Sequence, residues 1–145
     1  MENPALSAMV AALARQAADG AEASTLAASI TSTWQQIEQA LTPILGARGV
    51  AALFKRALFL TNDRFPWMEE ALAAVEAPGE HSALDGFGLV LGRQSAEAAA
   101  AGGGAFLSTF HGVLISMIGA TLTERLLQSV WGTLSSGPPA QDTTS

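Results

Sequence analysis

The sequence predicts an all-α fold, a compact bundle of five or six helices with a long, largely buried helix at its C-terminal end. Apolar residues recur every three to four positions along most of the 145-residue chain, which is the spacing of one helix face. Alternating β-branched runs, which would indicate strands, do not occur, and tyrosine is absent. The chain is 49% hydrophobic and 14% charged, which excludes disorder over most of its length and provides apolar surface for one core.

The first two helices are predicted from their end signals and their apolar faces. Asn3 and Pro4 suit the N-cap and the first position of a helix, and the Asp-Gly pair at 19–20 ends it. A second helix begins near Ser24 and repeats large apolar residues at helical spacing. Pro43 ends or bends this helix, because proline lacks the amide hydrogen that a helix interior needs.

The middle of the chain is predicted to hold three shorter helices. A turn at 44–46 leads into a helix over 47–60, which has the clearest apolar period of the whole sequence. A polar break at 61–64 follows, and Pro66 opens a fourth helix with two acidic residues in its first turn, where the helix dipole favours negative charge. A short fifth helix covers 83–91.

The last helix is predicted to run unbroken over 96–134, with Ser95 as its N-cap. Residues 135–145 form a polar tail containing proline and glycine, which we expect to be disordered. The chain therefore reads as a single helical-bundle domain over 1–134 followed by this tail. The residues expected in the core are Trp34, Leu53, Phe54, Leu58, Phe110, Leu114 and Met117.

Small residues recur every four positions along the last helix. The row consists of Ala96, Ala100, Gly104, Ser108, Gly112, Ser116 and Ala120. Three consecutive glycines at 102–104 would cost about 3 kcal/mol of helix stability, so close packing must offset that cost. Either neighbours within the chain or the same helix of a second copy could supply it. A third alternative is that the glycines form a loop that splits the helix.

A homodimer is predicted from this helix, with the two C-terminal helices packed across a two-fold axis. Large apolar residues cover nearly every side of it between Phe106 and Trp131, and a helix that is apolar all round has to be buried all round. The residues predicted at the dimer interface are Gly104, Ser108, Gly112, Ser116 and Ala120.

Basic residues cluster in one part of an acidic chain. Four of the seven Lys and Arg residues lie between positions 48 and 64, and they are Arg48, Lys55, Arg56 and Arg64. These four are the predicted binding site for an anionic ligand or an acidic partner surface. The alternative is a solvated helix face with ordinary salt bridges. Exposed aromatic side chains beside the arginines would favour the binding site.

The sequence offers no constellation that points to catalysis. It has no cysteine, which excludes disulfides and thiol chemistry. Of its two histidines, His81 is expected in a loop, and His111 has no Asp or Glu three or four residues away, as a metal site on one helix would require. We therefore expect no catalytic residues, no metal ligands and no cofactor. His111 is expected in the core or at an interface. Its alternatives are a haem or metal ligand and a phosphate-accepting histidine.

Charge and hydropathy narrow the class of function. A net charge of −6 argues against nucleic-acid binding. The acidic Glu2 argues against a signal peptide, and polar residues within the apolar stretch 105–122 favour a buried helix over a stable membrane span, so the expected location is the cytoplasm.

The expected function is a non-enzymatic regulatory or signalling module, a homodimeric bundle that binds a protein partner or a small ligand. The first alternative is a sensor that binds an anionic small molecule, such as a nucleotide, through the basic cluster. The second is a haem- or metal-binding bundle that uses His111.

Overall fold

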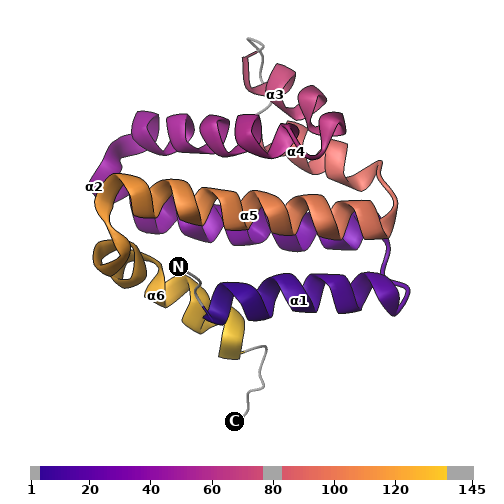
Figure 1. The fold of residues 1–145 in the computed structure, drawn as a ribbon, viewed down its shortest axis with the longest axis horizontal. Helices are drawn as coiled ribbons and strands as arrows, with labels where there is room; N and C mark the ends of the chain where they lie inside the picture. Colours follow the sequence, from indigo (N-terminus) through magenta and orange to yellow (C-terminus); the bar gives the residue numbers. More distant parts are fainter. Residues whose placement is uncertain (1–3, 77–82, 137–145) are drawn as a thin grey trace.

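The computed structural model describes residues 4–76 and 83–136, and every regular element in these two ranges is a helix. The elements are α1 (Pro4–Ala18), α2 (Ala23–Asn62), the 3-10 helix η1 (Pro66–Met68), α3 (Glu69–Glu76), α4 (Ala83–Gly92), α5 (Ala96–Ile118) and α6 (Ala120–Ser136). The predicted all-α bundle is confirmed. Figure 1 shows α5 crossing the middle of the bundle, with α1 on one side and the second part of α2 on the other.

The helix ends follow the local signals where the structure describes them. The hydroxyl of Ser95 accepts a hydrogen bond from the Ala98 amide at 3.1 Å, which confirms it as the N-cap of α5. The helix predicted to end at 60 continues to Asn62, and α6 extends to Ser136, two residues into the predicted tail. Asn3 and the rest of the tail from 137 lie outside the described residues.

Two glycines break the long helical stretches of the chain. Within α2, Gly46 has φ 79° and ψ 159°, and the chain turns back at this point although the helix passes through Pro43. Gly119 has φ 90° and ψ 157° and separates α5 from α6, so the prediction of one unbroken helix over 96–134 is wrong. Both residues occupy a backbone region that is essentially restricted to glycine. The two breaks lie at the same end of the bundle (Figure 1).

Five aromatic rings join α2, α4 and α5 at the centre of the core. They belong to Trp34, Phe54, Phe87, Phe106 and Phe110, and neighbouring centroids lie between 4.8 and 5.7 Å apart. Six of the seven predicted core residues are buried. The exception is Met117, whose side chain is 62% exposed. The prediction assumed a continuous helix, whereas the break at Gly119 sends α6 along another side of the bundle and leaves the end of α5 uncovered.

The glycine triplet 102–104 is helical and buried, so its reading as a loop is wrong. A Cβ on Gly102 would lie 2.5 Å from the Trp67 ring, and one on Gly103 would lie 2.0 Å from Ile30 Cδ1. A Cβ on Gly104 would lie 3.0 Å from a methyl carbon of Val10. The missing side chains therefore allow η1, α2 and α1 to approach α5 from three directions.

Candidate functional site

The second part of α2, which follows Gly46, separates apolar and basic residues onto opposite sides. Its buried side carries Val50, Leu53, Phe54, Ala57, Leu58 and Thr61. Its exposed side carries Arg48, Lys55, Arg56, Phe59 and Leu60, which together are referred to as the outer face of α2. Because the buried residues fix the rotation of the helix against the core, the outer face is held toward solvent.

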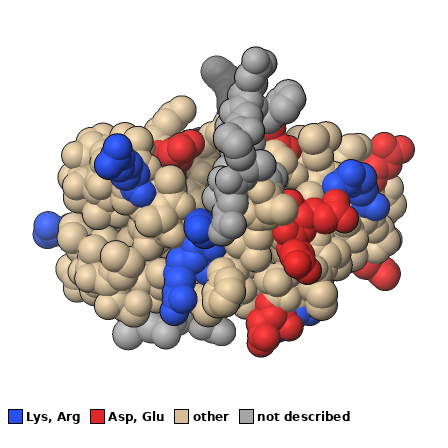
Figure 2. All heavy atoms as spheres, turned by 90° about the horizontal axis from the view of Figure 1, so that it is seen from above, with Lys and Arg blue, Asp and Glu red and all other residues tan. Residues whose placement is uncertain are grey.

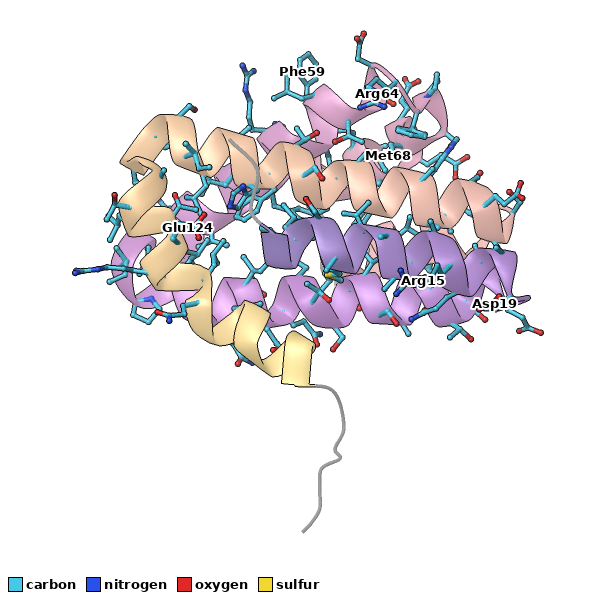
Figure 3. All side chains as sticks on the ribbon, turned by 60° about the horizontal axis from the view of Figure 1, so that its bottom comes forward. Arg15, Asp19, Phe59, Arg64, Met68 and Glu124 are labelled. Atoms are coloured by element: carbon cyan, nitrogen blue, oxygen red, sulfur yellow. The ribbon has the colours of Figure 1, made fainter. Side chains whose placement is uncertain are left out.

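Phe59 is the least expected member of this face, because its ring is 60% exposed. It follows Lys55 by four residues and Arg56 by three, which are the spacings at which side chains on a helix are neighbours. Figure 3 shows Phe59 projecting away from the bundle. A large exposed apolar ring thus follows two exposed cationic residues by one helical turn. This combination of an aromatic and basic residues is typical of a protein interface rather than of an ordinary surface.

Arg64, the fourth predicted basic residue, lies apart from the other three. It follows the end of α2, and its guanidinium carbon is 5.7 Å from the centroid of the Phe65 ring. Along the helix axis it is about 20 Å or more from Arg48. The four residues therefore form an extended exposed strip, too long to converge on one small anion. None of the four lines the cavities described below.

The other two aromatic residues near the cluster are structural. The rings of Phe65 and Trp67 contact each other, with centroids 6.1 Å apart, and both side chains are partly buried. Trp67 packs toward Gly102 of α5. Only Phe59 among the three is exposed, which the sequence did not distinguish.

The charges of the molecule are unevenly distributed around this face. Figure 2 looks onto the side formed by α2 and α3, and there the Lys and Arg atoms lie mainly over one half and the Asp and Glu atoms mainly over the other. The whole protein has a net charge of −6, whereas the outer face of α2 is basic. It can attract negatively charged surfaces that the rest of the molecule repels.

A groove between the first part of α2 and α4 was not predicted. It has a cavity volume of about 620 Å³, and small residues form much of its lining, including Ser24, Ala28, Gly88 and Gly92. A second cavity of about 330 Å³ shares Gln35 and Leu84 with it. The only sequence signal is the spacing of small residues four apart on both helices, which does not show how the helices cross.

His111 is buried on α5, with a side chain that is 3% exposed. Its Nε2 has no hydrogen-bond partner among the described residues. Burial lowers the pKa of the imidazole below its ordinary value of 6.5, and the negative charge of Glu124 on α6 partly opposes this shift. Within the described ranges, no group of three or more His, Asp or Glu side chains is placed to hold a metal ion.

The small-residue row of α5 divides into two parts. Gly104 is buried against Val10 of α1 within the chain. Ser108, Gly112 and Ser116 are exposed, and a Cβ on Gly112 would meet no atom within 4 Å. Ala120 is half-buried at the start of α6. The first part of the row thus packs within the chain, whereas the second part faces solvent.

By length and composition, α5 is long and apolar enough to cross a membrane, and nearly half of its most apolar window is buried inside the bundle. Comparison of the chain with protein-family models, with curated proteins and with solved structures gave no match.

Proposed function

We propose that the protein is a non-enzymatic regulatory module, a homodimeric helical bundle that binds an acidic partner protein through the outer face of α2. The observation that carries the proposal is the exposed ring of Phe59, one helical turn after the exposed Lys55 and Arg56. Aromatic residues and arginine are enriched in protein interfaces, where they supply most of the binding free energy.

The chemistry of this face defines the partner. Arg48, Lys55 and Arg56 would pair with carboxylates, and Phe59 and Leu60 would pack against one or two apolar side chains between them. An amphipathic helix or an extended segment with alternating acidic and apolar residues has this composition. Opposite charges would also accelerate encounter with such a partner.

A protein partner fits this face better than a small anion does. The basic side chains are exposed and extend over the length of a helix, whereas small ligands bind in concave sites that enclose most of their surface. The small-anion sensor is the alternative outcome of the same experiment.

The test uses a fluorescently labelled synthetic helical peptide that carries glutamate and leucine on one face. The full-length protein is titrated into this peptide, and fluorescence anisotropy measures binding. We expect binding that weakens as salt rises, since exposed charge pairs are screened. Arg56→Glu and Phe59→Ser should each weaken binding by about tenfold or more. Arg15→Glu makes the same charge change on the exposed part of α1, on the opposite side of the bundle (Figure 3), and should have little effect.

Two results would contradict the proposal. One is equal loss of peptide binding in Arg15→Glu and Arg56→Glu, which would show a response to net charge rather than to the face. The other is thermal stabilisation by nucleotides that Arg48→Ala and Arg56→Ala abolish, without any binding of the acidic helix. That result would establish the small-anion sensor instead.

A further inference from the structure

A ridge of three exposed side chains runs along α4 beside the groove. It consists of Asp85, Leu89 and Arg93, which are spaced four residues apart. Leu89 is 69% exposed, the most exposed of the large hydrophobic residues in the described part of the chain. All three line the groove, so an apolar side chain stands at its rim while its floor contains small residues such as Ala28 and Gly88.

This ridge is self-complementary under a two-fold rotation. Asp85 and Arg93 each lie about 6 Å along the axis from Leu89, on opposite sides of it, and they carry opposite charges. If a second α4 is laid antiparallel on the first, with Leu89 near the axis, each Asp85 faces the Arg93 of the other copy. A two-fold interface needs a surface patch that matches itself in this way.

We infer that this ridge and groove form the homodimer interface, with the two α4 helices antiparallel and the Leu89 of each copy packed over the groove of the other. The inference rests on the homodimeric state in the proposed function and adds the surface that produces it. The occupant of the groove is therefore a second copy of this chain. Its recognition combines an apolar contact with two symmetry-related charge pairs.

The contacts of Arg93 within the chain are compatible with this role. Its guanidinium pairs with the Glu70 carboxylate of α3, and both side chains are mostly exposed. A guanidinium has five N–H donors in a planar fork, so Arg93 can hold Glu70 and a second carboxylate at once. The pair with Glu70 also limits the conformations of Arg93 at the rim of the groove, which reduces the entropy lost on association.

The packing of α4 on α2 explains why the groove is open to a second copy. A Cβ on Gly88 would lie 3.2 Å from Thr31 Cγ2, and one on Gly92 would lie 3.9 Å from Ser24 Cα. The two helices are therefore close at their glycines, and small side chains leave the volume above them unfilled. A cavity of about 620 Å³ has room for an inserted leucine side chain.

The exposed row on α5 lacks such complementarity. Ser108, Gly112 and Ser116 form a smooth strip with no charged side chain among them. Near its end lies Met117, which at 62% exposed is closely matched to Leu89. A substitution of Met117 is therefore a suitable control, because it removes a similarly exposed apolar side chain from a different face of the protein.

The test measures the monomer–dimer equilibrium of the full chain by sedimentation over a range of concentrations. Leu89→Gln should raise the dimer dissociation constant about tenfold or more, because a central apolar anchor is lost. Met117→Gln should leave it unchanged. Circular dichroism checks that both variants keep the wild-type helix content, which we expect because both positions are exposed.

Charge exchange tests the antiparallel geometry directly. Asp85→Arg alone and Arg93→Asp alone should each weaken the dimer, because each places like charges opposite one another. The double variant Asp85→Arg with Arg93→Asp should bind more tightly than either single variant, because the symmetry restores opposite charges at both contacts between copies although the pair with Glu70 is lost. A purely structural role for either residue within the chain would not produce this recovery.

Three outcomes would overturn the inference. A dimer that survives Leu89→Gln and dissociates with Gly112→Leu or Met117→Gln has its interface on α5. If the dimer of the double variant is no tighter than the dimers of the single variants, the antiparallel pairing of the two α4 helices is excluded. If the wild-type chain stays monomeric at high concentration, both this interface and the homodimeric part of the proposed function are contradicted. Binding of the acidic helix by the outer face of α2 is tested separately, by the anisotropy titration.

Discussion

Gly103 and Gly112 lie in the same helix, nine residues apart, in opposite environments. A Cβ on Gly103 would overlap Ile30, at 2.0 Å from its terminal carbon, whereas a Cβ on Gly112 would meet nothing within 4 Å. The intrinsic helical cost of glycine is the same at both positions. The surroundings alone decide whether an added methyl group helps or harms.

Alanine substitutions at these two glycines should therefore change stability in opposite directions. Gly112→Ala should stabilise the protein by up to about 1 kcal/mol through helix propensity. Gly103→Ala has the same gain in helix propensity, but its methyl group overpacks the contact with Ile30. Because overpacking costs about 1–3 kcal/mol, we expect a net destabilisation. Urea unfolding of the two variants measures the difference. Equal stabilisation by both would show that Ile30 moves aside without cost.

His111 should make the stability of the protein depend on pH. Its pKa in the folded state is lowered by burial, although Glu124 opposes the shift, so the folded protein favours the neutral imidazole. The unfolded chain then binds more protons as the pH falls below the ordinary pKa of 6.5. The stabilisation is complete above that pH and is lost progressively as the solution is acidified.

The variant His111→Gln isolates this contribution, because it keeps a polar side chain but cannot titrate. Unfolding free energies measured between about pH 5 and pH 8 should fall more steeply toward acid in the wild type than in the variant. The other histidine and all carboxyl groups are common to both proteins and cancel in the comparison. Parallel curves would mean that His111 keeps its ordinary pKa in the folded protein.

At the scale of helices, glycine conformation sets where the long segments end. Gly46 and Gly119 have nearly the same positive φ and extended ψ, in a region that side chains with a Cβ avoid. Gly119→Ala should therefore destabilise the protein by about 1–3 kcal/mol, even though no atom lies within 4 Å of the added methyl group.

Gly112→Ala is the matched control for this prediction, and thermal unfolding measures both variants. Gly112 lies within α5 and is not among the glycines with positive φ, and, as at Gly119, no atom lies within 4 Å of the new Cβ. Its substitution should be neutral or stabilising. Stabilisation by Gly119→Ala as well would indicate that α5 continues into α6 as one helix.

Most helices could be predicted because each repeats apolar residues at helical spacing and carries its own end signals. The break at Gly119 could not, because Gly112 and Gly119 lie seven positions apart in the same apolar stretch, and the local sequence does not distinguish them. One is helical and the other is not, and the difference comes from how α6 packs back on the bundle. Local sequence does not contain that information.

The candidate site was predictable only in its charge. The four basic residues are apparent from the sequence, but their separation along α2 and the exposure of Phe59 depend on how α2 rotates against the core. The groove was missed for the same reason. It results from the crossing of the first part of α2 with α4, and the residues that line it, within 24–35 and 84–93, are far apart in the chain.

The two proposed recognition surfaces of the molecule share no residue. The outer face of α2 is basic and carries an exposed aromatic ring, whereas the ridge on α4 has one charge of each sign around a leucine. An acidic partner and a second copy would therefore not compete for the same side chains. In this arrangement a homodimer would present two outer faces of α2. A partner with two acidic segments would then bind the dimer more tightly than a partner with one such segment.

The aromatic cluster has a consequence for the order of events during synthesis. Trp34 and Phe110 are in ring contact, with centroids 4.8 Å apart, yet about half of the chain lies between them. While the ribosome is still translating α5, the apolar faces of α1, α2 and α4 have no complete core to enter. The aromatic cluster can therefore close only after Phe110 has left the exit tunnel, so the earlier helices wait for α5 before the core forms.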